Sequence, residues 1–372
     1  MDQIPETVLQ FGSGKFLRAF ADLFIHQANA EGQNVGRVVV VQSTGEGRAD
    51  LLNRQHGRYH VLVRGLAHGQ TVDRVEEAAS VSRALSAARE WSDVLAVARS
   101  PELRLVISNT AEVGYNLDPT DSPNITPPRS FPAKLLHVLH ERYRAQQPGV
   151  IILPCELFEH NADMLRGIII RLAEDWGLPG DFRDWLENEC RWHNTLVDRI
   201  VAVAPPGHPL LAEDPLTTVA EPYALWAIEV KRLPSQLFRH PAITETTNVE
   251  PYFLRKVRIL NAAHTALLSQ AIPRGLRFVR DAVLDPAVGA WLHRLLFEEI
   301  VPVVEGRVDD APGFANQVLE RFRNPFLEHK LSDIAVYHEA KVKIRLVPTR
   351  DEFQAKFGKV PPLLEAAIAW KP

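Results

Sequence analysis

Apolar positions in the first third of the chain alternate between short buried runs and helical spacing. An apolar run at 7–11 ends at Gly12, and residues 15–30 carry phenylalanine and leucine at the spacing of a helix. The β-branched run at 37–44, RVVVVQST, is typical of a buried parallel strand. A strand, a helix and a strand within about forty residues indicate a βαβ unit.

The same alternation continues through the next hundred residues. The pattern predicts, in order, hairpin-like alternation at 58–66, a helix at 81–99, buried strands at 103–110 and 149–157, and between these strands a Pro-rich loop that lasts until Pro132 starts the next helix. This is the pattern of a doubly wound α/β sheet, a Rossmann-like domain.

Beyond about residue 235 the character of the sequence changes. Helical spacing dominates at 252–272, 286–304 and 313–326, and only 341–348, KVKIRLVP, suggests another strand. We therefore expect a Rossmann-like domain over residues 1–240 and a mainly α-helical domain over residues 241–372.

Composition narrows the classes of protein that need considering. The 372 residues are 46% hydrophobic and carry a net charge of −4, which argues against nucleic acid as a partner. The two cysteines form no disulfide framework, and the 14 histidines show no metal-binding spacing. The N-terminus lacks signal-peptide features and no run matches a membrane span, so we expect a cytoplasmic protein that binds no metal, nucleic acid or membrane.

The stretch FGSGK after the first strand is a candidate phosphate-binding turn. A P-loop is excluded because Leu9 and Phe16 stand where that motif needs glycine and Ser or Thr. The G-x-G-x-x-G fingerprint of dinucleotide sites fits at Gly12 and Gly14, with Leu17 in place of its third glycine. A plain strand–helix turn fits equally well. Under the dinucleotide interpretation, the contacts come from Phe11, Gly12, Ser13, Gly14 and Phe16.

The end of the second strand leaves the choice of dinucleotide open. NAD sites usually have an acidic residue there for the ribose hydroxyls, but this strand ends in Gln42, Ser43 and Thr44. Neutral hydrogen bonds from Gln42 or Ser43 suit NAD, whereas the nearby Arg48 would suit the extra phosphate of NADP. We expect NAD, with NADP as the alternative.

A second candidate site lies in the stretch RKVRILNAAHTALL. On an α-helical wheel of about 100° per residue, Lys256, Asn261 and His264 share one side. A lysine among apolar residues can act as a base near neutral pH, an Asn amide can hold a developing alkoxide, and a His can orient a hydroxyl. An ordinary packed helix with one solvated lysine explains the same spacing.

The pattern Lys-x4-Asn-x2-His resembles the signature of the polyol-specific long-chain dehydrogenases, the mannitol dehydrogenase family. The stretches LQFGSGKFLRAF, VISNTAEVGYN, IILPCELFEHNADMLR, NTLVDRIV and ERFRNPFLEHKL are similar to its tagaturonate reductase branch. The resemblance implies an NAD-dependent enzyme that interconverts a ketouronate and an aldonate, tagaturonate and altronate, as a monomer or homodimer.

The resemblance also implies roles for particular residues. Lys256 would be the general acid–base, Asn261 would polarise the carbonyl, and His264 would position the substrate. Further predicted contacts are Asp198 and Asn161 to the substrate and Asn109, Thr110 and Glu112 to the cofactor.

A carboxylate substrate needs a cation, and HEAKVKIRLVP offers Lys341, Lys343 and Arg345, where the family also has basic residues. We expect Lys343 and Arg345 to bind the carboxylate, although a solvated basic face is the plainer interpretation.

Two departures from the family keep other functions open. In mannitol dehydrogenases a second oxyanion-holding Asn stands where this chain has Leu157. The family usually has an acidic residue just before the catalytic Lys, whereas the nearest acid upstream of Lys256 is Glu250. The chain also looks shorter than its relatives. The alternatives are therefore a fructuronate reductase, a mannitol-type polyol dehydrogenase, or a nucleotide-binding relative without turnover.

Overall fold

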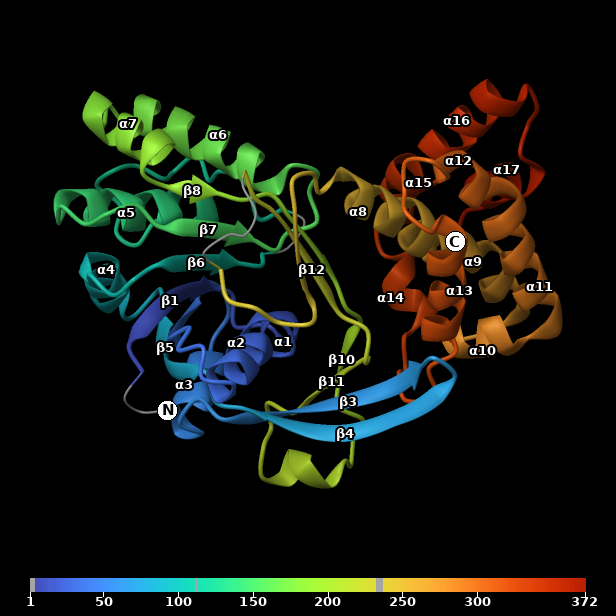
Figure 1. The fold of residues 1–372 in the computed structure, drawn as a ribbon, viewed down its shortest axis with the longest axis horizontal. Coiled ribbons are helices and arrows are strands. Elements are labelled where there is room, and N and C mark those ends of the chain that lie inside the picture. The colour runs from blue at the N-terminus through green and yellow to red at the C-terminus, as the bar shows by residue number, and fades with distance from the viewer. Residues whose placement is uncertain (1–3, 111–112, 232–236) are drawn as a thin grey trace. The chain divides into compact units, whose positions relative to one another are not determined.

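The computed structural model describes residues 4–110, 113–231 and 237–372, which form two compact units (Figure 1). The first unit comprises Met1–Leu62, Val75–Thr218 and Ala224–Val249, and the second comprises Val63–Arg74, Val219–Tyr223 and Glu250–Pro372. The division after Val249 lies nine residues beyond the boundary expected from sequence at 240, because β13 (Ile243–Thr246) pairs with β12 (Leu225–Glu229) in the first unit.

The first unit is built on a six-stranded sheet in the order β5-β2-β1-β6-β7-β8, and its strand pairs are parallel. The strands are β1 (Glu6–Phe11), β2 (Arg37–Gln42), β5 (Val81–Ser86), β6 (Leu105–Ser108), β7 (Ile151–Pro154) and β8 (Arg191–Trp192). This is the doubly wound order 3-2-1-4-5-6, in which ligands bind beyond the carboxyl ends of the strands where the order reverses. Here that point lies between β1 and β6, and the predicted Rossmann-like class is confirmed.

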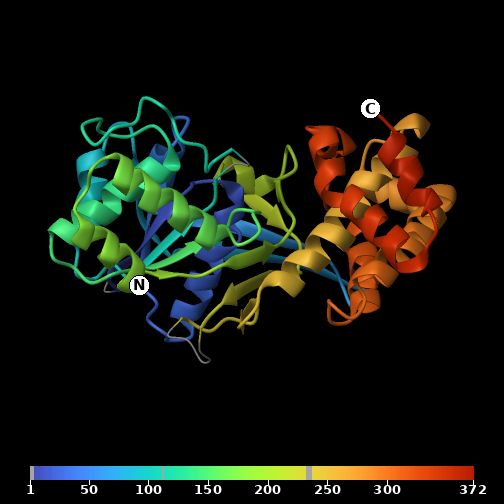
Figure 2. The same ribbon diagram turned by 90° about the horizontal axis from the view of Figure 1, so that it is seen from above.

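Helices surround this sheet, and they are α1 (Lys15–Arg18), α2 (Ala21–Ala30), α3 (Arg48–Arg54), α4 (Trp91–Arg99), α5 (Phe131–Arg144), α6 (Asn161–Asp175) and α7 (Gly180–Asn188). Buried residues of α4 to α7 join Leu9, Val39 and Val106 of the sheet in one apolar core (Figures 1 and 2).

Two smaller sheets follow the orders β10-β11-β3-β4 and β13-β12-β9. Their remaining strands are β3 (Tyr59–Ala67), β4 (Gln70–Ala78), β9 (Thr195–Asp198), β10 (Val201–Val203) and β11 (Thr218–Ala220).

The second unit is mainly helical, as predicted, and appears in orange to red in Figure 2. Its helices are α8 (Glu250–Arg255), a π-helix (Lys256–Asn261), α9 (Ala262–Ala271), α10 (Val279–Leu284), α11 (Pro286–Arg294), a second π-helix (Leu295–Ile300), α12 (Val301–Val304), α13 (Ala311–Phe322), α14 (Leu331–Ala335), α15 (His338–Arg345), α16 (Val347–Phe357) and α17 (Pro362–Ala369). Helix α9 is buried almost along its whole length, because α10, α11, α14, α15 and α17 pack around it.

Three predicted elements were wrong in part. The helix expected at 81–99 begins at Trp91, because Val81–Ser86 pairs in parallel with β2. The helix expected at 15–30 is broken between Arg18 and Ala21. The strand suggested at 341–348 is the helix α15, in which Val342 is buried and the polar residues around it are partly or fully exposed.

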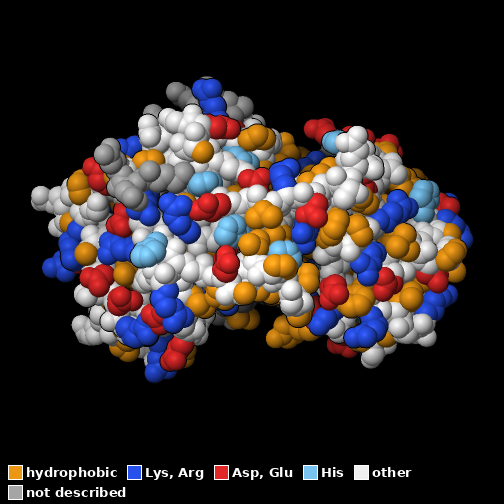
Figure 3. Space-filling view, turned by 90° about the horizontal axis from the view of Figure 1, so that it is seen from below, with side chains coloured by type: hydrophobic (Ala, Val, Ile, Leu, Met, Phe, Trp, Pro, Cys, Tyr) orange, Lys and Arg blue, Asp and Glu red, His pale blue; other side chains and the backbone are white. Residues whose placement is uncertain are grey.

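The described surface carries charges of both signs. On the face shown in Figure 3, acidic and basic side chains are intermixed, as the small net charge suggests. Across the described residues, no helix has the length and apolarity to cross a membrane, and no three His, Cys, Asp or Glu side chains gather as a metal site would need.

Candidate active site

The glycine turn after β1 contains two glycines with different roles. Gly12 has a φ of +123°, and a Cβ there would lie 2.8 Å from the carbonyl oxygen of Asn109, so the fold itself requires glycine. Gly14 has an ordinary φ of −68°, and a Cβ there would meet no protein atom within 4 Å. Gly14 therefore leaves open space in front of the turn, which fits the close approach of a dinucleotide pyrophosphate.

Arg18 supports this turn from inside the first unit. Its side chain is 6% exposed and donates to the carbonyl oxygen of Ser13 at 2.8 Å and to that of Leu216 at 3.1 Å. The guanidinium thus fixes the backbone of the turn through its own hydrogen bonds.

A buried polar cluster lies beside Arg18. Gln10 donates to the carbonyl oxygen of Gly12 at 3.1 Å and to Asp22 at 3.3 Å, and the Tyr59 hydroxyl donates to Asp22 at 3.2 Å. Burial raises the pKa of Asp22 to about 7, against the opposing effect of these hydrogen bonds and of Arg18. A carboxyl group that titrates near neutral pH therefore underlies the turn.

At the end of β2, the predicted ribose contacts Gln42 and Ser43 differ in whether their polar groups are already hydrogen-bonded. The Gln42 amide donates to the carbonyl oxygen of Thr44 at 3.2 Å and accepts from the Ala49 N–H at 2.7 Å, so it holds the loop before α3. The Ser43 hydroxyl has no hydrogen-bond partner among the described residues. Arg48 is exposed at the start of α3.

At the end of β6, Asn109 and Thr110 are tied to the segment after β7. Asn109 donates to the carbonyl oxygen of Cys155 at 2.8 Å, and the Thr110 N–H donates to Glu156 at 2.9 Å. Glu112 lies outside the described residues. Phe11 is fully buried, and Phe16 stacks on Phe20 with ring centroids 4.9 Å apart.

Two predicted substrate contacts lie buried in the first unit. The Asn161 amide donates to the carbonyl oxygens of Pro154 and Glu156 at 3.0 Å each and accepts from the Thr195 N–H at 2.9 Å. These bonds join α6 to β7 and β9 and occupy the amide. Asp198 is 2% exposed at the end of β9.

The predicted catalytic residues lie in the second unit, on a helix that changes its winding. Lys256 and Asn261 are the first and last residues of a π-helix, so the α-helical wheel used to predict their face does not apply. In a π-helix the hydrogen bonds join residues five apart, which places Lys256 and Asn261 one above the other. His264 follows Asn261 by three residues in α9 and shares its face.

Asn261 and His264 carry buried polar atoms without partners. They are 8% and 7% exposed, and the Asn261 Nδ2 and His264 Nε2 atoms have no hydrogen-bond partner among the described residues. An unpaired buried polar group is costly, and a bound ligand is one partner that can satisfy it. Lys256 is half-buried beside them in sequence.

Basic side chains surround His264. Its ring stacks on Phe322 with centroids 4.1 Å apart and meets His329 edge-on at 4.8 Å. Burial, and then the charges of His329 and Arg345, hold the pKa of His264 well below its usual range. The imidazole is therefore neutral at neutral pH in a cationic environment, which suits an anionic substrate.

The three predicted cations on helix α15 do not all lie on the same face of the helix. Arg345 donates to the Thr265 hydroxyl at 3.3 Å, and both Arg345 and Lys341 contribute to the low pKa of His264. Lys343 is exposed, two residues from each, and therefore lies on another face of the helix. The structure brings Arg345 and Lys341, but not Lys343, toward His264.

One buried ion pair in this unit escaped the sequence analysis. Arg321 donates to Glu221 at 2.7 and 2.9 Å, and the two side chains are 2% and 1% exposed. The guanidinium also lies 4.2 Å from the ring centroid of Tyr223. A local pattern could not reveal this pair, because its members are 100 residues apart in sequence.

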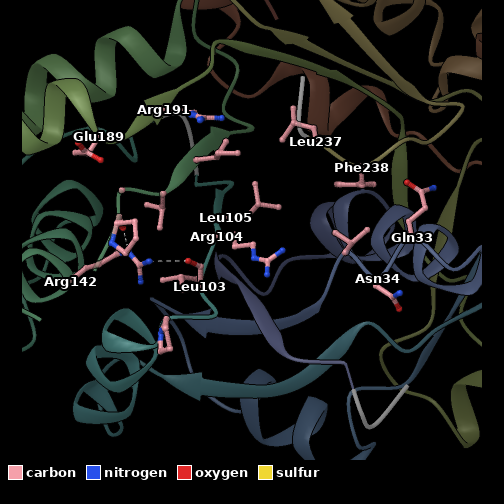
Figure 4. Close-up of a pocket in the computed structure, with 16 residues that line it drawn as sticks. Gln33, Asn34, Leu103, Arg104, Leu105, Arg142, Glu189, Arg191, Leu237 and Phe238 are labelled. Atoms are coloured by element: carbon pink, nitrogen blue, oxygen red, sulfur yellow. Dashed lines mark hydrogen bonds between the residues drawn. The ribbon is translucent and has the colours of Figure 1, made fainter. Parts of the chain in front are cut away.

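In the first unit, a cavity of about 680 Å³ lies at the edge of the six-stranded sheet opposite to the glycine turn (Figure 4). Leu105 and Ile151, at the amino ends of β6 and β7, line it together with Arg104 and Arg191. None of the predicted site residues is among the described residues that line it. Its place at the amino ends of the strands separates it from the glycine turn.

Comparison with known proteins agrees with the fold and the motifs. Residues 6–239 match the family model of the mannitol dehydrogenase Rossmann domain, and residues 248–371 match that of the mannitol dehydrogenase C-terminal domain. The chain belongs to the mannitol dehydrogenase family.

Curated relatives include the altronate oxidoreductase of Halalkalibacterium halodurans, which is 39% identical over 99% of this chain and 74% of its own length. The altronate oxidoreductase of Bacillus subtilis is 37% identical over 96% of this chain and 77% of its own length.

Among solved structures, mannitol 2-dehydrogenase of Pseudomonas fluorescens, in a ternary complex with NAD and D-mannitol, superposes with a TM-score of 0.83 at 22% identity. That match covers 99% of this chain and 79% of the other. A D-sorbitol dehydrogenase in substrate-free form superposes with a TM-score of 0.80 at 24% identity, covering 95% and 78% of the two chains. These likenesses confirm the fold.

Proposed function

We propose that this protein is an altronate oxidoreductase, which interconverts tagaturonate and altronate with NAD(H). The observation that carries the proposal is the pair of unpartnered buried atoms, Asn261 Nδ2 and His264 Nε2, in a cationic environment. Altronate oxidoreductases that are 35–39% identical over nearly the whole chain support the choice of substrate.

The first unit would hold the cofactor. Gly12 and Gly14 bring the backbone to the pyrophosphate, and the Ser43 hydroxyl is free to bind the ribose near the end of β2. When bound, NAD(H) supplies or accepts the hydride. Its ribose would meet neutral groups here, which favours NAD over NADP, although Arg48 nearby leaves NADP as the alternative.

The second unit would act on the substrate oxygen. In the direction of reduction, the Lys256 ammonium donates a proton to the carbonyl oxygen as it becomes a hydroxyl, and in the direction of oxidation the Lys256 amine takes that proton back. The Asn261 Nδ2 group donates a hydrogen bond to the same oxygen and stabilises its developing negative charge. Neutral His264 orients a neighbouring hydroxyl.

Arg345 and Lys341 would bind the uronate carboxylate. An arginine suits a planar carboxylate because its N–H groups form two parallel hydrogen bonds. Asn161 would act mainly by fixing the backbone around it, since its amide is occupied, and Asp198 stays a predicted substrate contact.

The test is NADH oxidation, followed by absorbance, with tagaturonate, fructuronate and fructose offered in turn. We expect the highest kcat/KM with tagaturonate, and a much lower one when NADPH replaces NADH. A preference for fructuronate or fructose would replace the substrate and keep the chemistry. NADH binding without turnover of any of the three would instead identify a nucleotide-binding relative.

A further inference from the structure

Glu156 is a buried carboxylate at the carboxyl edge of the six-stranded sheet, and the proposed reaction gives it no part. It lies two residues beyond the end of β7, and its side chain is 3% exposed. Its two oxygens accept four hydrogen bonds. The donors are the Ser108 hydroxyl at 3.0 Å, the Thr110 N–H at 2.9 Å, the Thr110 hydroxyl at 3.1 Å and the Tyr115 hydroxyl at 3.2 Å.

All four donors belong to β6 or to the segment that follows it. A carboxylate has about four acceptor positions, so these donors occupy the group fully. Glu156 therefore ties the end of β6 to the end of β7, and a fifth hydrogen bond, from Asn109 to the carbonyl oxygen of Cys155 at 2.8 Å, runs alongside. No other described side chain joins the two strand ends by so many bonds.

The end of β6 is also in contact with the glycine turn. The Asn109 carbonyl oxygen faces Gly12 so closely that a Cβ on Gly12 would lie 2.8 Å from it. The reversal of strand order lies between these two strands, β1 and β6, where a dinucleotide crosses the sheet edge. The adenosine half lies on the β2 side of such a crossing, so β6 and β7 serve the nicotinamide half.

We propose that Glu156 is a positioning residue that sets the affinity for the nicotinamide half of the cofactor, by fixing Asn109 and Thr110 at the end of β6. The inference rests on the proposed function, because it needs a bound nicotinamide dinucleotide. Glu156 itself has no oxygen left for a ligand and acts through its neighbours.

The test compares two probes, NADH and AMP, by titration against the purified full chain. AMP contains the adenosine half and lacks the nicotinamide. We expect Glu156→Ala to raise the Kd for NADH about tenfold, as the loss of several hydrogen bonds predicts, and to leave the Kd for AMP within about twofold. Glu156→Gln should stay close to wild type for both probes, because its carbonyl still accepts from Thr110 while its amide donates to the two hydroxyls.

Two further variants separate an effect on cofactor affinity from an effect on folding. Glu156→Asp keeps the charge but shortens the side chain, and it should raise the NADH Kd about fivefold even if the Ala variant does not fold. Glu299→Ala removes another buried carboxylate, one that accepts from the Leu363 and Leu364 N–H groups of the second unit. That control should lower the melting temperature without changing either Kd.

Unchanged NADH affinity in both the Ala and Asp variants would overturn the inference, and so would an equal loss for AMP and NADH. Wild-type protein that binds neither probe would overturn the proposed function itself. Wild-type protein that binds both probes, with a selective loss of NADH in the variants, would support the inference even if no ketouronate is turned over.

Discussion

Four predicted site residues, two in each unit, differ in how their side chains are hydrogen-bonded. In the first unit, Asn161 and Gln42 have their amide groups engaged by backbone atoms of neighbouring segments. In the second unit, Asn261 and His264 are also buried, yet each has a polar atom without a partner among the described residues. For these four residues, hydrogen bonding separates the two pairs better than burial does: the paired amides hold the fold, and the unpaired atoms are available to a ligand.

The same substitution at two asparagines tests this contrast most strongly. Asn161→Ala should lower the free energy of unfolding by about 3 kcal/mol, because it leaves the Thr195 N–H and neighbouring groups without their partner. Asn261→Ala should leave stability unchanged or slightly higher and lower kcat about 100-fold or more. Denaturant melts and steady-state kinetics measure both, and similar profiles for the two variants would break the comparison.

Two faces of α15 give a second matched pair, because Arg345 faces Thr265 and Lys343 is exposed. Arg345→Met should lower kcat/KM for tagaturonate by about 10- to 100-fold, because it removes a charged hydrogen bond to the carboxylate, while kcat/KM for fructose changes little. Lys343→Met, on the face away from His264, should change neither by more than about twofold. Equal losses for the charged and the neutral substrate in Arg345→Met would argue against carboxylate binding.

The glycine turn offers a pair within the first unit. Gly12→Ala should cost about 1–3 kcal/mol of stability, because of its positive φ and its contact with Asn109. Gly14→Ala should cost less than about 1 kcal/mol but raise the Kd for NADH about tenfold, since its methyl group enters the open space before the turn. Full NADH affinity in the folded Gly14→Ala protein would remove the turn from the cofactor site.

Asp22 gives a smaller, pH-dependent effect. Its pKa rises on folding from an ordinary 3.8 to about 7, so the folded state holds a proton that the unfolded state has released. The contribution of Asp22 to wild-type stability should therefore fall as the pH rises between about 4 and 7 and stay lowered above that range. Asp22→Asn lacks this group, so its stability relative to wild type should increase by about 1–3 kcal/mol across the range. Denaturant melts of both proteins at several pH values measure how each free energy of unfolding changes with pH. Parallel curves for wild type and Asp22→Asn would contradict the expectation.

The sequence predicted most of the sheet, because its strands are short β-branched runs that end in glycine or small polar residues. Val81–Ser86 was missed since its partner strand, β2, is forty residues away and its own pattern is weak. The π-helix at Lys256–Asn261 has no local signal in the sequence, so the face of the predicted catalytic residues was drawn from the wrong winding.

The candidate site was likewise predictable from the sequence only where the signal is local. The motif located Lys256, Asn261 and His264, but only the structure tells which candidates keep unpaired atoms. Thr195, which donates to Asn161, lies 34 residues away along the chain, and the donors to Glu156 lie 41–48 residues away, so these pairings depend on the fold. The choice between Arg345 and Lys343 likewise needed the helical form of α15, which the sequence suggested as a strand.

The proposed reaction needs an acid–base group at the substrate oxygen, and Lys256 is the residue proposed for it. The most direct measurement is tagaturonate-dependent NADH oxidation by wild-type protein and by Lys256→Ala, with the NADH Kd measured for both. We predict turnover by the wild type, a loss of about 1,000-fold or more in the variant, and equal NADH affinities. A variant that keeps most of the wild-type rate, or a wild-type protein that binds NADH and turns over none of the three sugars, would contradict the account.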